Sequence, residues 1–131
     1  MATILVWMDS AVSKDRIKAI LKNHIQISVD DLDQALAALR SPSQIDLILC
    51  GLNLENNNCF DFVRAAKKTE GRMSTPFVIC CGSRKSMSKS LDEAVRVASR
   101  AAGADHYIDA STLYSDEFAK LVEGWLRVES S

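Results

Sequence analysis

Residues 76–83 read Pro-Phe-Val-Ile-Cys-Cys-Gly-Ser, an apolar run enclosed by a proline and a glycine-serine pair. A run that is apolar at every position is typical of a strand buried on both faces of a parallel sheet. Residues 4–8 form a second such run, which ends at Asp9-Ser10, and residues 45–50 are a third predicted strand. We therefore expect three parallel strands, each of which opens into a polar loop.

Two shorter strands and five helices account for the rest of the chain. Residues 25–29 alternate as a half-buried strand requires, and residues 106–108 are predicted as a fifth strand. Ser13 and Ser115 are the expected N-caps of the first and last helices. Apolar residues at helical spacing define the helices. They are Ile17, Ile20 and Leu21 in a helix over 14–23; Leu32, Ala35, Leu36 and Leu39; Phe60, Val63 and Ala66; Leu91, Ala94, Val95, Ala98 and Ala102; and Phe118, Leu121, Val122 and Trp125.

Five strands that are each followed by a helix predict one parallel sheet covered on both faces. Parallel neighbours need crossover connections, which are nearly always right-handed. We expect the strand order 2-1-3-4-5 in an α/β, flavodoxin-like (βα)5 three-layer sandwich, with residues 1–131 as a single domain. In this order the loops after the first, third and fourth strands converge at the carboxyl edge of the sheet. Any functional site is expected there.

Composition and charge predict a cytoplasmic protein without nucleic-acid or membrane partners. Of the 131 residues, 47% are apolar and 25% are charged, and the formal net charge is -1. This balance provides no general attraction to nucleic acid or anionic lipid. No apolar run approaches the roughly 20 residues that span a bilayer. Residues 1–9 also lack the basic start and long apolar stretch of a signal peptide.

The cysteines show no paired Cys-x-x-Cys spacing, and three of them lie in or beside apolar segments. We interpret them as reduced core thiols. The alternative is a redox-sensitive site at Cys81, close to Cys50 on an adjacent strand, with Arg84 and Lys85 nearby to favour the thiolate. The four cysteines are Cys50, Cys59, Cys80 and Cys81.

Residues 46–54, Asp-Leu-Ile-Leu-Cys-Gly-Leu-Asn-Leu, followed by Phe-Asp-Phe at 60–62, resemble the third strand and following loop of two-component response-regulator receiver domains. The most specific match is Gly-Ala-Asp-His-Tyr-Ile at 103–108, which is similar to the family's Gly-Ala-Asp-x-Tyr-Leu. Residues 4–9 and 76–81 resemble the first and fourth strands, so the resemblance covers essentially the whole chain. It implies phosphorelay signal transduction, with a histidine kinase, another regulator or a scaffold as partner.

The resemblance also implies that the phosphate-accepting site is degenerate. An active receiver needs an aspartate after the third strand, two acids after the first, a hydroxyl after the fourth and a lysine after the fifth. Here Gly51 occupies the aspartate position, Cys81 the hydroxyl position and Ala110 the lysine position, while Met8 and Asp9 replace the acid pair. Because glycine supplies no nucleophile, we expect a pseudo-receiver that is not an enzyme and that acts by binding partners.

Asp9 and Tyr107 are the remaining candidate site residues. Asp9 alone supplies too few hard anionic ligands for a tight magnesium site, so only weak Mg²⁺ binding and no other cofactor is expected. The alternative is that Asp9 caps the next loop or stays solvated. Tyr107 aligns with the aromatic that changes rotamer in phosphorylation-switched receivers. Without phosphate, a packed or surface side chain is the favoured interpretation.

Further hypotheses concern the surface. The basic residues Arg84, Lys85 and Lys89 either touch an acidic partner or, as we favour, form a solvated loop. The segment 81–103 is longer than usual in the family, and we interpret it as reshaped for a partner. Because receivers often pair through the fourth and fifth helices, an exposed part of the last helix would be a homodimer face. The rival is a flavodoxin-like ligand- or cofactor-binding protein, although no glycine-rich phosphate cradle follows Val6.

Overall fold

A five-stranded parallel sheet forms the centre of the molecule. In the computed structural model all neighbouring strands are parallel, and their order is β2-β1-β3-β4-β5. This confirms the predicted strand order. The strands are β1 (Thr3–Trp7), β2 (Ile25–Ser28), β3 (Leu47–Gly51), β4 (Phe77–Cys81) and β5 (His106–Asp109). The structure describes residues 2–8, 11–51, 58–81, 89–109 and 115–130.

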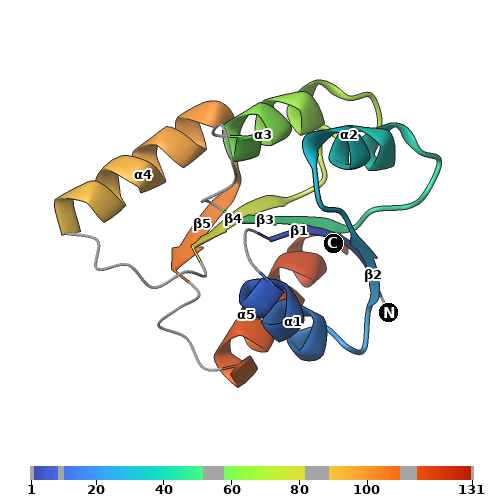
Figure 1. Ribbon diagram of the computed structural model, residues 1–131, viewed down its shortest axis with the longest axis horizontal. Coiled ribbons are helices and arrows are strands. Elements are labelled where there is room, and N and C mark those ends of the chain that lie inside the picture. Colours follow the sequence, from blue (N-terminus) through green and yellow to red (C-terminus); the bar gives the residue numbers. More distant parts are fainter. Residues whose placement is uncertain (1, 9–10, 52–57, 82–88, 110–114, 131) are drawn as a thin grey trace.

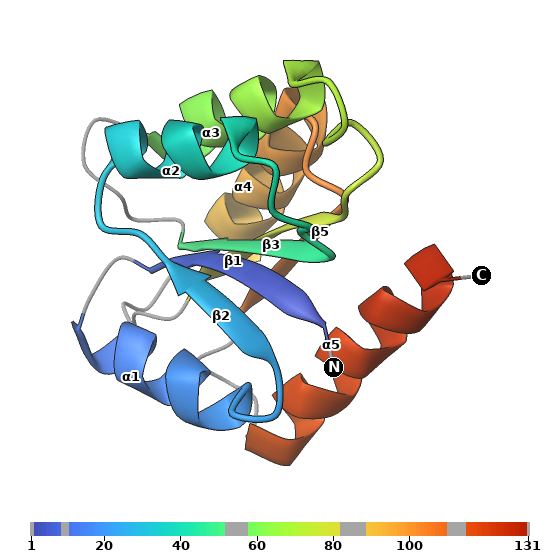
Figure 2. The ribbon, with the colours of Figure 1, turned by 90° about the vertical axis from the view of Figure 1, so that its right-hand side faces the viewer.

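Helices cover both faces of this sheet. They are α1 (Ala11–Ile20), α2 (Leu32–Arg40), α3 (Asn58–Lys68), α4 (Lys89–Ala102) and α5 (Ser115–Ser130). The helices α2, α3 and α4 lie on one face of the sheet, and α1 and α5 lie on the other (Figure 1). The view in Figure 2 separates the three layers, which confirms the flavodoxin-like sandwich. None of the helices described here is both long enough and apolar enough to pass through a membrane.

Successive strand residues point to opposite faces, so the sheet separates two hydrophobic cores. Under α2, α3 and α4, the rings of Trp7, Phe62 and Phe77 pack together. Their centroids lie 5.5 Å apart between Trp7 and Phe62 and 5.1 Å apart between Phe62 and Phe77. Under α1 and α5, the side chains of Leu21 and Phe118 are buried. Every residue of β3 is buried, as predicted for a central strand.

The boundaries of α1 differ from the prediction. The helix begins and ends three residues earlier than the predicted range 14–23, so the expected N-cap at Ser13 was wrong. A serine marks an N-cap only where the helical backbone starts, and here that start precedes it. At the other end, Gln26 Nε2 donates to the carbonyls of Lys18 and Leu21 at 3.1 and 3.0 Å. The bond to Lys18 satisfies a carbonyl near the helix end, and the Leu21 carbonyl also accepts the His24 N–H at 2.9 Å.

The helix α4 turns only part of its predicted apolar stripe to the core. Ser99 is completely buried, and its Oγ donates to the Val95 carbonyl at 2.8 Å. A hydroxyl that is satisfied within its own helix can be buried at little cost. Val95 and Ala102 are half-buried, whereas Ala94 and Ala98 are exposed. The predicted apolar stripe therefore faces the core only in part.

The helix α5 follows its predicted stripe more closely. Phe118 and Val122 are completely buried, whereas Leu121 is 38% exposed. Trp125 is half-buried, and its ring stacks on that of His106 in β5 with centroids 5.3 Å apart and planes inclined by 21°. The stripe thus begins in the core and ends at the edge strand of the sheet.

Candidate functional site

Gly51 ends β3 at the carboxyl edge of the sheet, where the sequence predicted the site. It is buried and pairs in register with Cys80 of β4. The preceding residue, Cys50, donates its thiol to the Gly51 carbonyl at 3.5 Å and pairs with Trp7 of β1. The described side chains that flank Gly51 on these strands are thus thiols and an aromatic ring. None of them resembles the carboxylate that attacks phosphorus in an aspartyl-phosphate mechanism.

Of the other predicted site positions, the structure places Cys81 at the same edge. Cys81 is the last residue of β4 and pairs in register with Asp109 of β5. Asp9 and Ala110 lie outside the described residues, as do Arg84 and Lys85 of the basic segment. Within the part of the chain that the structure describes, no group of three or more histidine, cysteine, aspartate or glutamate side chains could hold a metal ion.

Tyr107 lies inside the core between β5 and α4. Only 5% of the residue is exposed, and it pairs in register with Ile79 of β4. The guanidinium carbon of Arg96 lies 5.4 Å from the centroid of the tyrosine ring, within the range of a cation–π interaction. Arg96 Nη1 also donates to the Tyr107 carbonyl at 3.5 Å. In this position Tyr107 packs α4 onto the edge strand.

The described thiols are core residues, as predicted. Cys50, Cys59 and Cys80 are buried and form no disulfide. Cys50 belongs to the core under α2, α3 and α4, whereas Cys80 belongs to the core under α1 and α5. In register, Cys50 faces Ile79, two residues before Cys81. The thiol of Cys81 lies outside the described part of the structure, so its redox role stays a prediction.

The outward side of α4 carries an apolar surface. Ala94, Val97, Ala98 and Ala101 are exposed, and Val97 is 60% exposed. Their spacing of i, i+3, i+4 and i+7 places them on one side of the helix. We call these four residues the α4 outer face. It forms because the helix buries Ser99 and leaves its alanines in solvent.

Two aspartates hold the amino ends of strands. The sequence analysis did not predict this role. The Thr3 N–H donates to Asp46 Oδ2 at 2.9 Å, and the Asp46 N–H donates to the Thr3 carbonyl at 2.8 Å. Asp105 binds Phe77 in the same way at the start of β4. Both aspartates precede a strand by one residue in the sequence. That position marks the two aspartates as candidates, but the residue that each one binds follows only from the strand register.

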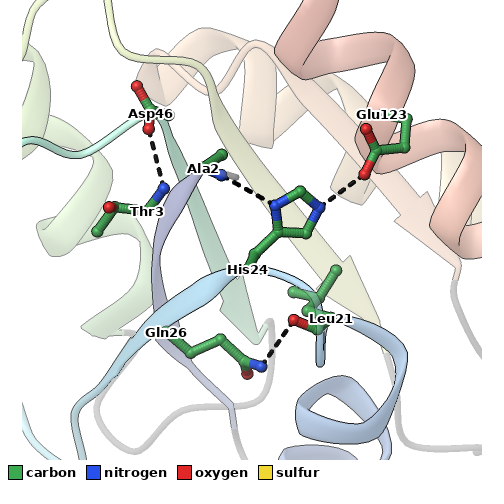
Figure 3. Close-up of polar contacts among 7 residues, drawn as sticks. All are labelled: Ala2, Thr3, Leu21, His24, Gln26, Asp46 and Glu123. Atoms are coloured by element: carbon green, nitrogen blue, oxygen red, sulfur yellow. Dashed lines mark hydrogen bonds and ion pairs between the residues drawn. The ribbon is translucent and has the colours of Figure 1, made fainter.

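His24, which sequence analysis did not assign to any site, connects three elements. Its Nδ1 accepts the Ala2 N–H at 3.1 Å, and its Nε2 lies 2.6 Å from Glu123 Oε1 of α5 (Figure 3). The side chain is 12% exposed. The contact depends on the fold, because residues 24 and 123 meet only when α5 packs below β1 and β2.

Comparison with known proteins places the fold. A scan of the sequence against protein-family models finds no match, and neither does a search of curated proteins. Solved structures do match. A two-component response regulator from Clostridium difficile aligns with a TM-score of 0.80 and 16% identity over 100% of both chains. The chemotaxis response regulator CheY4 of Vibrio cholerae aligns with a TM-score of 0.78 and 18% identity over 95% of this chain and 98% of that chain.

A third structure, the receiver domain of a sensor histidine kinase from Pseudomonas aeruginosa with magnesium in its active-site cleft, has a TM-score of 0.75 and 18% identity. It covers 96% of this chain and 98% of that chain. The protein therefore has an α/β fold of the flavodoxin-like class. More narrowly, its fold is that of the receiver domains of two-component systems.

Proposed function

We propose that this chain is a pseudo-receiver, a signalling module that acts through protein contacts without accepting phosphate and without catalysing a reaction. The observation that carries the proposal is Gly51, which is buried at the carboxyl end of β3. Its side group is a hydrogen atom, so the position offers no oxygen for a phosphoryl group. A shift in local pKa cannot supply the missing atom. Ala110 likewise supplies no cation for the phosphoryl oxygens.

The same substitutions weaken metal binding. Magnesium prefers an octahedral set of oxygen ligands in which carboxylates provide the anionic charge. Gly51 offers only its carbonyl, which already accepts the Cys50 thiol, and Met8 replaces one acid of the usual pair. Asp9 is then the remaining acid of that pair. We propose weak Mg²⁺ binding at most and no other cofactor.

The proposed contact surface lies on α4 and α5. The α4 outer face exposes apolar side chains, including Val97 at 60%. On α5, Trp125 is half-buried against His106 of β5, and Leu121 is exposed. The residues of the α4 outer face lie on one side of the helix, and apolar surface grouped in this way is typical of protein contacts. Histidine kinases, other regulators and scaffolds are the partner classes that the receiver fold suggests.

The charges beside the α4 outer face are suited to a second copy of the chain. Glu93 and Arg100 are exposed and lie seven residues apart along one edge of the α4 outer face. In an antiparallel pair of α4 helices around a two-fold axis, Glu93 of one copy lies opposite Arg100 of the other, and the contact occurs twice. The interface is therefore self-complementary. We propose a homodimer through α4 and α5.

Intact-mass measurement tests the proposal. The protein is incubated with Mg²⁺ and a small phosphodonor, beside an active receiver domain as a positive control. We expect no phosphoryl adduct on this chain and an adduct on the control. A hydroxylamine-sensitive adduct, the signature of an acyl phosphate, would refute the proposal. The Gly51→Asp variant shows whether the missing carboxylate alone accounts for the result.

The alternatives have weaker support. Burial of Cys50, Cys59 and Cys80 limits the access of oxidants to these thiols, so a redox sensor would have to depend on Cys81. A flavodoxin-like cofactor protein would show bound flavin in the absorption spectrum of the purified protein. No observation among the described residues favours either function over the pseudo-receiver.

A further inference from the structure

The bonds of the His24 ring fix which nitrogen carries the proton. Nδ1 accepts the Ala2 N–H at 3.1 Å, so Nδ1 has a free lone pair and no hydrogen. The neutral ring therefore carries its proton on Nε2, which lies 2.6 Å from Glu123 Oε1 and donates to it. The ring thus bridges the backbone before β1 and the side of α5 (Figure 3). Glu123 is a carboxylate and can only accept.

We propose that His24 is a proton-sensitive latch that holds the amino end of β1 to α5 when neutral and releases Ala2 when protonated. A second ring proton occupies the Nδ1 lone pair and turns that atom into a donor. Two donors then face each other, and the Ala2 bond must break. The contact with Glu123 persists, because protonation turns it into an ion pair. Protonation therefore opens one side of the bridge and strengthens the other.

The surrounding contacts limit how far the opening spreads. The Ala2 carbonyl accepts the N–H of Ile25, the first residue of β2, at 2.9 Å and does not depend on the ring. Thr3 is held from the opposite side by Asp46. When His24 is protonated, the Ala2 backbone therefore loses one of its two hydrogen bonds, and the Thr3 backbone keeps both. The latch acts on the amino edge of the sheet, away from Gly51, and is independent of the proposed pseudo-receiver role.

Charged groups on each neighbouring element define the electrostatic setting. Glu123 is the carboxylate that meets the ring from α5, with 52% of its side chain exposed. Asp46, before β3, binds the backbone one residue further along β1. On the chain that leads to the ring, Lys18 in α1 and Lys22 after it are exposed. His106, the other histidine, stacks on Trp125 and serves as an internal reference.

Nuclear magnetic resonance of the ¹⁵N-labelled chain tests the latch. Intact mass identifies the preparation in which Met1 is retained, and the measurement uses that preparation, because Ala2 then carries an amide N–H. Ring ¹⁵N shifts then report the tautomer and protonation of His24 in a pH series from about 5 to 8. Solvent-exchange measurements give the protection of the Ala2 amide at each pH. We expect the Nε2–H tautomer in the neutral ring and a roughly fivefold to tenfold loss of Ala2 protection as His24 gains its second proton.

The His24→Asn variant is the matched control. Asparagine Oδ1 takes a position similar to that of Nδ1 and accepts the Ala2 N–H, but it does not titrate. In this variant Ala2 protection is expected to stay constant over the same pH range. Three results would each overturn the latch: a neutral ring protonated on Nδ1, Ala2 protection that ignores His24 protonation, or an equal loss of protection in His24→Asn.

Discussion

Asp105 binds both backbone polar groups of Phe77. The Phe77 N–H donates to Asp105 Oδ2 at 2.8 Å, and the Asp105 N–H donates to the Phe77 carbonyl at 2.9 Å. The same Oδ2 accepts a hydrogen bond from the Lys67 ammonium at 2.7 Å, and Lys67 also donates to the Thr75 carbonyl at 3.1 Å. One carboxylate oxygen thus ties the start of β4 to α3. The ring of Phe77 is fixed in the core by its contact with Phe62. The bonds of Asp105 to Phe77 therefore help to fix the register of β5 on β4.

The Asp105→Ala variant should lose stability. It leaves the Phe77 N–H and the Lys67 ammonium without their carboxylate partner, and about 2 kcal/mol of the free energy of unfolding should be lost. The exposure of the Asp105 side chain, 43%, keeps the loss from being larger, since water can replace part of the interaction. Urea denaturation measures it. The exposed residue Glu70 offers a control, and Glu70→Ala should change stability little. An equal effect of the two substitutions would contradict the role of Asp105.

Substitution by alanine should have opposite effects on stability at Gly103 and at Gly124. Gly103 has φ of 117°, and a Cβ there would lie 3.2 Å from Lys67 Cγ. Gly103→Ala should therefore cost about 1–3 kcal/mol of unfolding free energy. Gly124 lies inside α5, and a Cβ there meets nothing within 4 Å. Gly124→Ala should stabilise the protein by about 0.5–1 kcal/mol. Thermal unfolding that shifts in the same direction for both variants would be inconsistent with this account.

Arg72 binds the carboxyl end of α2 and should contribute more to stability than Arg40, an exposed arginine in the last turn of that helix. Arg72 is only 8% exposed. Its Nε donates to the Leu39 carbonyl at 3.0 Å, and its Nη2 donates to the carbonyls of Ser41 and Ser43 at 2.9 and 2.7 Å. Arg72→Met should cost at least about 2 kcal/mol, because these carbonyls lose a charged donor. The control is Arg40→Met, in the exposed last turn of α2.

Arg72→Lys adds a second comparison to this prediction. Lysine keeps the charge but lacks the planar guanidinium group that reaches several carbonyls at once. Its stability in urea should lie between those of the wild type and Arg72→Met. If Arg72→Lys equals the wild type, charge alone holds the end of α2, and the geometric explanation fails.

Charge reversal tests the proposed homodimer. Glu93→Arg and Arg100→Glu each place like charges opposite one another twice, and should weaken self-association about tenfold. The double variant Glu93→Arg/Arg100→Glu restores opposite charges and should recover the wild-type dissociation constant. Sedimentation equilibrium measures all four proteins. Failure of the double variant to recover, with both single variants folded, would exclude the antiparallel α4 pairing.

The architecture was predictable from sequence because it depends on local composition. Apolar runs such as 77–81 can be buried on both faces only in the middle of a sheet, and helical spacing between them leaves few possible topologies. The face of α4 was not predictable in the same way. Ser99 is buried because its hydroxyl bonds to Val95 within the helix, and residue type alone would have placed it in solvent.

The site was predictable only to the extent that it depends on residue identity. The loss of the carboxylate at Gly51 follows directly from the sequence once β3 is located. The bridge through His24 depends instead on residues 99 positions apart and on how α5 packs below the sheet. Such contacts leave no periodic signal in the chain. The paired bonds of Asp46 with Thr3 also require the strand register, which the sequence does not specify.

Release of inorganic phosphate from a small phosphodonor tests whether the chain can accept phosphate, since it would also detect an adduct too short-lived for mass measurement. We expect the chain with Mg²⁺ to leave the breakdown rate of the phosphodonor at the protein-free value, and an active receiver domain to raise it. A saturable, Mg²⁺-dependent acceleration by this chain would contradict a pocket in which Gly51 has replaced the nucleophile.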